Sequence, residues 1–411
     1  MNKKKKVCRM CDGKEFSKVL DMGCNALVNS LTEEKDLNET ELTYPLKVVR
    51  CDKCSLVQVE KPIDPHKIYK EVDYLYFSSD MPGFSKYFKE YATEVAERFL
   101  KFGDFVLEIG SNDGIMLEHF ANMDNMDFRV LGVDPATNVV LRALARGVPT
   151  VPLFFEERLA KMIAKELGQA KVVYGNNCIA HIDDLDSVME GVKGVTTDDG
   201  VFIVECNYWG GMVKNKNYSL VYHDHFSYFS LKNWVDYAPK FGFEVFDAEV
   251  TPAQGGSLRV FMQKGKPQLT TRCANLQMEE EELGINTLAV AKRYGKECVE
   301  EAEKLRVVVE RIKEEGKVIA GYGAAAKGFS VLKLAQINEK HIDYFVDDSP
   351  AKQGKYTPVA HIPVISRDEA EAKLPDYFFI TAPNYAQIIM EKEKEKGYKG
   401  KFILCDSTVI E

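Results

Sequence analysis

Residues 105–135 read FVLEIGSNDGIMLEHFANMDNMDFRVLGVDP, and this stretch indicates the fold of the longest part of the chain. Apolar runs at 105–110 and 128–134 predict two strands with a helix between them. Gly110 and Gly114 follow the first strand, where glycine lets the backbone approach a ligand, and Asp134 ends the second strand, where a carboxylate can accept hydrogen bonds from ribose hydroxyls. Asn112 stands where a pyrophosphate-binding loop has its middle glycine, which favours a nucleoside cofactor without phosphate. The alternative is a glycine-rich turn that only lets a helix pack on a strand.

Further strands follow at 148–154, 171–177 and 200–206, mostly separated by helical stretches, as in a parallel sheet. Runs at 243–250 and 257–264 are separated only by a glycine-rich turn and predict a terminal antiparallel pair. Seven strands in this order are typical of class I S-adenosylmethionine methyltransferases, and residues 76–270 are assigned to such a domain. The predicted cofactor-binding residues lie in the first loop and at strand ends: Glu108, Gly110, Asn112, Gly114, Asp134, Asn176 and Asn177.

Two cysteine pairs near the start of the chain predict a metal site. Cys8 and Cys11 form one C-x-x-C, and Cys51 and Cys54 form another. Four thiolates suit tetrahedral Zn²⁺, and a metal with every position filled has a structural rather than a catalytic role. Residues 1–75 are therefore predicted to be a zinc-binding domain with a strand-rich insertion between the pairs. Cys24 is expected to be a bystander.

The last third of the chain predicts a second α/β unit. Residues 271–315 are rich in Glu, Lys, Ala and Leu without proline and predict a helical connector. Residues 316–411 alternate strands and helices, as in a Rossmann-like domain. Gly321, Gly323 and Ala326 open a helix directly after a strand, so the free amides and Lys327 are candidates to hold a phosphate. The same pattern of small residues would also suit binding of NAD. A further alternative is a degenerate Rossmann-like unit that binds no ligand and serves only in assembly.

Composition excludes several classes of protein. The chain has 411 residues, 54 basic and 63 acidic side chains and a formal charge of -9, which argues against a nucleic-acid binder. No uncharged stretch is long enough for a transmembrane helix, and no apolar run follows the basic start as in a signal peptide. A cytoplasmic protein without membrane partners is expected. Ten cysteines in a chain of this length do not indicate a disulfide scaffold.

The run 219–229, SLVYHDHFSYF, gathers two of the seven histidines among aromatic and hydroxyl side chains after the fifth predicted strand. His223 and His225 would share one face of a strand as a metal pair, but no further ligand is evident. A histidine base beside tyrosine hydroxyls is preferred, because an imidazole can take up a proton near neutral pH. The ordinary alternative for either histidine is a hydrogen-bonded structural role.

Motifs over essentially the whole chain support a resemblance to one family. They are the two cysteine pairs, VLEIGSNDG, Tyr222-His-Asp-His225-Phe-Ser-Tyr-Phe, Gly255-Gly-Ser-Leu-Arg259, Gly323-Ala-Ala-Ala-Lys327-Gly, and Asp347-Asp-x-Pro with Lys352-Gln-Gly-Lys-Tyr-Thr-Pro358. Together they resemble the three-domain sugar C-methyltransferases of deoxysugar biosynthesis. The resemblance implies an α/β fold with a zinc-binding N-terminal domain, a class I methyltransferase core and a Rossmann-like C-terminal domain. It also implies S-adenosylmethionine and structural Zn²⁺ as cofactors, and a nucleotide-linked 4-keto-deoxysugar held between the last two domains.

The resemblance also implies catalytic residues. His225 matches the base, Tyr222 and Asp224 match the tyrosine and the acidic position of the same motif, His181 matches the histidine after the fourth strand, and Tyr76 matches the tyrosine at the mouth of the site. Substrate contacts are expected from Gly323 and Lys327.

Two departures leave the sugar open: the family usually has glutamate at Asp224, and histidine at Gln254. The expected reaction is removal of a proton from the carbon next to the ketone, followed by attack of the carbanion on the sulfonium methyl group. N- or O-methylation of such a sugar is the first alternative, since the same base would serve. A zinc-knuckle binding module with a vestigial core and an NAD-dependent oxidoreductase are the others. A monomer or weak homo-oligomer is expected.

Overall fold

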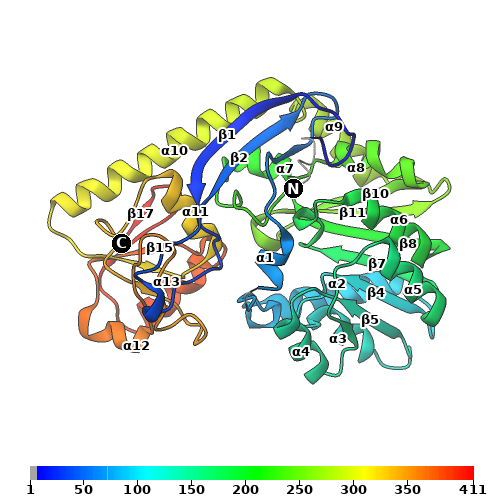
Figure 1. Cartoon of the computed structure of the whole chain (residues 1–411), viewed down its shortest axis with the longest axis horizontal. Coiled ribbons are helices and arrows are strands. Elements are labelled where there is room, and N and C mark those ends of the chain that lie inside the picture. The colour runs from blue at the N-terminus through cyan, green and yellow to red at the C-terminus, as the bar shows by residue number, and fades with distance from the viewer. Residues whose placement is uncertain (1–6, 72) are drawn as a thin grey trace.

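The computed structural model describes residues 7–71 and 73–411. The chain forms three sheets, with the N-terminal ribbon and one long helix extending across the other two units (Figure 1). The prediction that no signal peptide is present rests partly on the basic start of the chain. Residues 1–6, which include it, lie outside the described residues. Within those residues, no helix combines the length and apolar character that crossing a membrane requires.

The central sheet has the order β10-β11-β8-β7-β4-β5-β6. Its strands are β4 (Phe105–Ile109), β5 (Arg129–Val133), β6 (Thr150–Val151), β7 (Ala170–Asn176), β8 (Thr196–Asn207), β10 (Phe243–Thr251) and β11 (Ser257–Lys264). All neighbouring strands from β8 to β6 run parallel, whereas β11 runs antiparallel between β8 and β10. The predicted seven-stranded layout is thus confirmed.

Continuous apolar sequence explains this sheet, because all five residues of β4 are buried between two helical layers. The surrounding helices are α2 (Phe84–Phe99), α3 (Ile115–Ala121), α4 (Thr137–Ala145), α5 (Glu157–Leu167), α6 (Leu185–Val195), α7 (Trp209–Asn215) and α8 (Leu231–Tyr237). The strand predicted at 148–154 is much shorter in the structure, since Pro149 and Pro152 flank Thr150–Val151 and proline has no amide hydrogen for a ladder.

The N-terminal sheet has the order β1-β2-β3-β9. It comprises β1 (Phe16–Asn25), β2 (Tyr44–Cys51) and β3 (Val57–Val59) from the start of the chain, and β9 (Ser227–Tyr228) from the run that contains His225. Val57 pairs with Tyr228 and Gln58 with Ser227. The zinc-binding region and the predicted catalytic segment therefore share a sheet. The short helix α1 (Pro65–Tyr69) follows β3.

The β1–β2 ribbon also contacts the C-terminal unit. Thr32, between the two strands, exchanges backbone hydrogen bonds with Tyr356, with N···O distances of 2.9 and 2.8 Å. A Cβ on Gly295 would lie 1.8 Å from the Val19 carbonyl oxygen, so only glycine lets the long helix approach the ribbon this closely. The ribbon thus joins the two larger units, as Figure 1 shows in blue.

The C-terminal sheet has the order β14-β13-β12-β15-β16-β17. Its strands are β12 (Ile319–Tyr322), β13 (Phe345–Val346), β14 (Val364–Ile365), β15 (Tyr377–Ile380), β16 (Lys401–Ile403) and the antiparallel β17 (Val409–Ile410), with helices α11 (Ala326–Leu334), α12 (Arg367–Ala370) and α13 (Ala386–Glu395). The predicted helical connector is α9 (Thr271–Glu282) and α10 (Leu288–Glu314). The five parallel strands, β12 to β16, and their crossovers give the predicted Rossmann-like arrangement.

Candidate functional site

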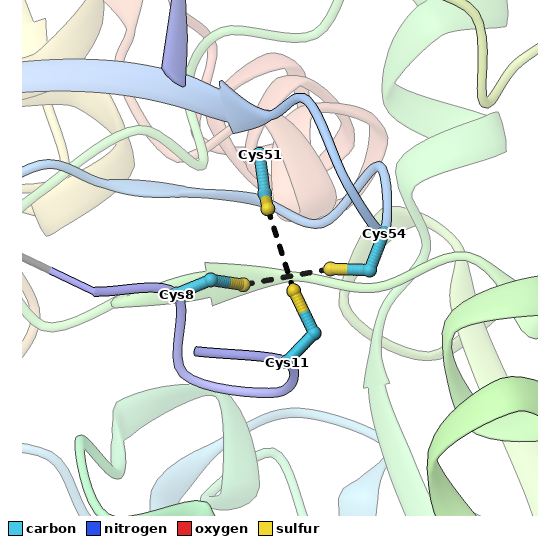
Figure 2. A group of neighbouring side chains, drawn as sticks. All are labelled: Cys8, Cys11, Cys51 and Cys54. Atoms are coloured by element: carbon cyan, nitrogen blue, oxygen red, sulfur yellow. Dashed lines mark hydrogen bonds between the residues drawn. The ribbon is translucent and has the colours of Figure 1, made fainter. Parts of the chain in front are cut away.

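The four paired cysteines come together as a tetrahedral donor set. Their Sγ atoms all lie within 4.8 Å of one another, and Sγ–Sγ distances are 3.5 Å for Cys8–Cys54 and for Cys11–Cys51 (Figure 2). A Zn–S bond of about 2.3 Å requires sulfur atoms about 3.8 Å apart, so the donor set fits this ion. Among the described residues, these four cysteines are the group of Cys, His, Asp and Glu side chains that lie close enough together to hold a metal ion. Cys24 is exposed and outside it, as predicted.

Neighbouring residues pack closely against the four sulfur atoms and form a hydrogen bond to one of them. A Cβ on Gly13 would lie 2.9 Å from Cys51 Sγ, and Gln58 Nε2 donates to Cys8 Sγ at 3.3 Å. Arg9, between the first two cysteines, donates to Gln58 Oε1 and to Asp183 Oδ1, both at 2.9 Å. Because Asp183 follows the fourth strand of the central sheet, the cysteine knuckle is tied to the central unit as well as to its own sheet.

The loop after β4 has the backbone conformation that its glycines allow. Gly110 and Gly114 have φ values of 66° and 77°, and Asn112 lies between them at 49°. A Cβ on Gly110 would lie 2.3 Å from Cys178 Cβ, so the loop packs directly against the segment that follows β7. Asn177, at the start of that segment, also has positive φ, and its N–H donates to the Glu205 carbonyl oxygen at 2.7 Å. Both predicted loops thus lie at the carboxyl edge of the sheet.

Asp134 lies at the same edge of the sheet, directly after the end of β5. Its Oδ2 accepts from the Asn112 N–H at 3.0 Å and its Oδ1 from the Ala136 N–H at 2.9 Å. Burial raises the pKa of Asp134 to about 6, although these two amide donors oppose the shift. Each carboxylate oxygen retains a lone pair, so the side chain can still accept hydrogen bonds from a ligand's hydroxyl groups.

Polar atoms without partners mark the same edge. Asn176 and Glu205 are in register on β7 and β8, and both Asn176 Oδ1 and Glu205 Oε1 are buried without a hydrogen-bond partner. Glu108, one strand further, is buried and accepts from the Tyr174 hydroxyl at 3.2 Å. Unpaired buried acceptors are costly, so this edge has the donor and acceptor pattern of a ligand site.

His225 lies in a buried aromatic group beside this edge. Its Nδ1 lies 2.7 Å from the Leu220 carbonyl oxygen, which can only accept, so Nδ1 carries the proton and Nε2 the lone pair. Asn207 Nδ2 lies 3.0 Å from Nδ1 and 3.3 Å from Nε2. Burial, with a contribution from His181, lowers the pKa of His225 well below its usual value. The imidazole is therefore neutral near pH 7, as a proton acceptor must be.

The predicted partners His181 and Tyr222 flank His225. Ring centroids are 5.0 Å apart for His181–His225 and 4.0 Å apart for Tyr222–His225. Burial lowers the pKa of His181 to about 4, and the Tyr69 hydroxyl lies 2.7 Å from its Nδ1. Burial raises the pKa of Tyr222, so its phenol stays protonated and can donate.

The two residues that precede His225, His223 and Asp224, form contacts away from it. Residues 222–226 form a turn rather than a strand, so His223 and His225 do not share a face and form no metal pair. The His223 Nε2 donates to the Tyr44 carbonyl oxygen at 3.1 Å, away from His225. Asp224 is buried, accepts from Asn29 Nδ2 at 3.2 Å, and has a pKa raised to about 7 by burial.

Tyr76 and Lys327 come from different domains and meet at Gln254. Gln254 Nε2 donates to the Tyr76 hydroxyl at 2.9 Å, and Lys327 Nζ donates to the Gln254 carbonyl oxygen at 2.8 Å and to its Oε1 at 3.1 Å. Burial lowers the pKa of Lys327 to about 7. In its charged form an ammonium has three donors, so one remains for a ligand. Gly323, in the loop before α11, has φ 94° and donates its N–H to the Val346 carbonyl oxygen at 2.7 Å.

A cavity of about 500 Å³ lies where the ribbon, the Tyr222–His223 segment and α11 meet. Apolar side chains of all three parts line it, including Met22, Leu46, Val221, Phe329, Leu332 and Ile362. Two lining groups, His223 Nδ1 and Asn25 Oδ1, are buried without a hydrogen-bond partner. Tyr222 lines this cavity and also contacts His225, so a single ring separates the cavity from the imidazole.

Comparison with known proteins assigns all three units. Residues 8–69 match the family model "Putative zinc binding domain", residues 84–248 match "Methyltransferase domain", and residues 252–405 match "C-methyltransferase C-terminal domain". C-methyltransferase NovU of Streptomyces niveus is 34% identical over 391 residues, which are 94% of this chain and 92% of NovU. The chain belongs to the three-domain C-methyltransferases.

Two solved methyltransferase structures each match just under half of this C-methyltransferase. A S-adenosylmethionine-dependent methyltransferase from Clostridium acetobutylicum is 11% identical and covers 46% of this chain and 94% of its own, with a TM-score of 0.35. The plantazolicin methyltransferase BpumL in complex with SAH is 10% identical and covers 46% and 87%, with a TM-score of 0.36.

The C-methyltransferase depends on S-adenosylmethionine and carries a structural zinc site. The chain's residues fit both groups: four sulfurs have tetrahedral spacing, and the carboxyl edge of the central sheet offers unpaired acceptors beside Asp134. The Asn112 side chain forms hydrogen bonds within the protein, and its role toward the cofactor stays a prediction. Its Oδ1 accepts from the Ser78 N–H at 2.8 Å and its Nδ2 donates to the Tyr76 carbonyl oxygen at 3.1 Å.

Sequence reasoning assigned no role to one charged group of the C-methyltransferase. Arg259 on β11 donates to Glu205 Oε2 at 2.9 Å and to the Tyr87 hydroxyl at 2.7 Å, and its guanidinium stacks 3.4 Å from the Tyr91 ring centroid. Glu205 and Arg259 are both buried. The available signal was one charged residue within each of two apolar runs, residues 201–206 (VFIVEC) and 258–262 (LRVFM).

Proposed function

We propose that the protein methylates the carbon next to the ketone of a nucleotide-linked keto-deoxysugar, with His225 as the base. Membership of the C-methyltransferases is established above, whereas the sugar, the base and the enolate are the proposal. The observation that carries it is the state of His225: its Nδ1–H is held by Leu220 and its pKa is lowered, so Nε2 offers a lone pair at neutral pH. It lies beside the carboxyl edge at which the cofactor loop ends.

The chemistry follows from these groups. A carbon next to a ketone is acidic enough for an imidazole to take its proton. The proton goes to His225 Nε2 and the electron pair of the C–H bond moves onto the ketone oxygen, giving an enolate. Tyr222 and Tyr76 keep their protons and stabilise that oxygen by donating hydrogen bonds. S-adenosylmethionine supplies an electrophilic methyl group when bound.

His181 and Asp224 support the base in this proposal. His181 lies beside His225, and its own lowered pKa keeps it neutral near pH 7, so at that pH it places no positive charge next to the base. Asp224 holds its segment to the N-terminal unit through Asn29. Because β9 follows directly and pairs with β3, the imidazole is fixed by a sheet rather than a free loop.

Different residues would bind the cofactor and the metal. Asp134 would accept hydrogen bonds from the ribose hydroxyls, with Glu108, Asn176 and Asn177 at the neighbouring strand ends and Gly110 and Gly114 shaping the loop. Cys8, Cys11, Cys51 and Cys54 would hold Zn²⁺ as thiolates. With four thiolate ligands the metal would have no open position, and it would serve to connect the N-terminal sheet to the central unit.

The nucleotide would occupy the junction of the three units. The cavity of about 500 Å³ next to Tyr222 is large enough for a small organic group, and His223 Nδ1 offers an acceptor there. The remaining donor of Lys327 and the loop at Gly323 would contact the phosphates. In this proposal the sugar would lie between Tyr222 and the carboxyl edge of the central sheet.

A ligand panel followed by product analysis tests the proposal. Nucleotide-linked keto-deoxysugars are screened by thermal shift with S-adenosylhomocysteine present, since a ligand that binds only the native state raises its melting temperature. With the sugar that binds, ¹³C-methyl-labelled S-adenosylmethionine should give a product whose label is bonded to carbon. A label on oxygen or nitrogen, or stabilisation by no nucleotide-linked sugar, would overturn the proposal.

A further inference from the structure

Gln254 contacts three parts of the active-site region at once. It lies between β10 and β11, has a φ of 53°, and bonds Tyr76 at the mouth of the site, Lys327 on α11 and Asn384 before α13. A residue other than glycine rarely adopts this left-handed conformation, so the position is held by its contacts.

Its donors and acceptors fix how the side-chain amide is turned. Lys327 Nζ lies 3.1 Å from Gln254 Oε1, and an ammonium group can only donate, so the amide atom that faces it is the carbonyl oxygen. Asn384 Nδ2 lies 3.4 Å from the same oxygen. The opposite atom, which lies 2.9 Å from the Tyr76 hydroxyl, must be the Nε2 donor.

The direction of the Tyr76 hydroxyl follows from that amide. Its oxygen accepts from Gln254, so its own hydrogen points to another group, and the Ser78 side chain is the other protein partner of this hydroxyl. Burial raises the pKa of Tyr76, which keeps this hydrogen in place at neutral pH. The backbone around Tyr76 is held independently, because Asn112 bonds the Tyr76 carbonyl oxygen and the Ser78 N–H.

We propose that Gln254 is a positioning residue that keeps Tyr76 a hydrogen-bond donor toward the substrate oxygen, and that Lys327 fixes this polarity across the interface with the C-terminal domain. The inference rests on the proposed function, in which that oxygen becomes an enolate. A carboxylate at position 254 would reverse the bond, because it would accept the Tyr76 hydrogen. Histidine would preserve it, because a neutral imidazole has one nitrogen to accept from Lys327 and one to donate to Tyr76.

Kinetics of four variants test the inference: Gln254→Glu, Gln254→His, Tyr76→Phe and the double variant Gln254→Glu/Tyr76→Phe. Tyr76→Phe should lower kcat by roughly 10²-fold, the usual effect of losing one donor to a developing oxyanion. Gln254→Glu should lower kcat to a similar extent with little change in KM, and Gln254→His should retain nearly all activity. The double variant should be no slower than Tyr76→Phe alone, since both changes remove the same hydrogen bond.

An additive loss in the double variant, or a Gln254→Glu enzyme as active as wild type, would overturn the inference. Unchanged affinity for S-adenosylhomocysteine by calorimetry confirms that the variants are folded. If wild type itself methylates no nucleotide-linked sugar, it is the proposed function that fails.

A measurement without any sugar keeps the inference testable in that case. A fluorinated tyrosine is incorporated at position 76 and its phenol titrated by ¹⁹F NMR. The phenol pKa should be lowest in wild type and Gln254→His, higher in Gln254→Leu and highest in Gln254→Glu. Equal values in wild type and Gln254→Leu would contradict a donated hydrogen bond from Gln254.

Discussion

Replacing Asp134 by asparagine should weaken cofactor binding and remove its dependence on pH. The carboxylate already accepts one backbone N–H on each oxygen, from Asn112 and Ala136, and each oxygen keeps a lone pair that can accept from a ligand. The amide of asparagine keeps one acceptor oxygen but replaces the other with a donor, which cannot accept from either an amide or a ribose hydroxyl. The substitution therefore removes charge-assisted hydrogen bonds without creating a cavity.

The expected magnitude comes from those bonds. A hydrogen bond to a charged group contributes about 1.5 to 3 kcal/mol, so Asp134→Asn should weaken binding of S-adenosylhomocysteine about 10- to 100-fold at pH 8. Burial raises the pKa of Asp134 to about 6 in the free protein. Because the protonated carboxyl is the weaker acceptor, wild-type affinity should fall as the pH decreases below about 6 and stay level above it. The asparagine variant should lack this component of the pH dependence.

Calorimetric titration with S-adenosylhomocysteine between pH 5 and pH 8 measures both effects. Asp198→Asn is the matched control, because Asp198 is a fully exposed aspartate at the opposite end of β8. Equal affinity of Asp134→Asn and wild type at pH 8 would refute the assigned contact. The same fall in affinity toward low pH in both proteins would refute the role of Asp134 in the titration.

Three further predictions concern stability and the metal. Cys51→Ser should release zinc, measured by elemental analysis, and lower the melting temperature, whereas Cys24→Ser should change neither; full zinc content in Cys51→Ser would exclude a four-thiolate site. Arg259→Met leaves the buried Glu205 carboxylate without its cation and should cost about 3 to 5 kcal/mol in urea unfolding, with partial recovery when Glu205→Gln is added; an unchanged midpoint would contradict the buried pair. Burial lowers the pKa of His181 to about 4, so the free energy of unfolding of the wild type should fall as the pH falls from about 6.5 to 4, by at most about 3 kcal/mol. The His181→Asn variant should lose less stability over the same range. Parallel plots of unfolding free energy against pH for the two proteins would show that His181 does not contribute.

The central sheet was predictable because the parts of its strands that lie inside the sheet are buried on both faces. β4 and residues 201–206 of β8 are nearly continuous apolar runs, and such runs separated by helical segments indicate a parallel sheet without further information. The paired cysteines were equally informative, because each pair lies in one tight turn and only the distance between the turns was unknown. Their convergence confirmed the prediction.

The orientation of side chains in the 219–229 run was not predictable in the same way. Periodicity places alternate residues on one face only within a strand, and here a turn brings Tyr222 beside His225 while His223 points to Tyr44. Nothing in the local sequence indicates that β9 begins at Ser227 and pairs with β3, because that pairing joins segments far apart in the chain.

The contacts between domains were beyond sequence reasoning for the same reason. Gln254 was noted only as a departure from a family pattern, and Lys327 only as a candidate phosphate contact. Their hydrogen bond depends on how α11 lies against the β10–β11 turn, which neither segment specifies alone. The roles of these residues and of His225 remain predictions about function, whereas their positions are structural observations.

The most direct test of the central claim is hydrogen exchange at the carbon next to the ketone. Wild-type protein, S-adenosylhomocysteine and the nucleotide-linked keto-deoxysugar are incubated in D₂O, and loss of the α-proton signal is followed by NMR without any methyl transfer. Exchange should occur with wild type and be slower by roughly 10² to 10⁴ with His225→Asn, the usual contribution of a general base, while both ligands still bind. Undiminished exchange in His225→Asn, or its loss only in His181→Asn, would contradict the assignment of His225 as the base.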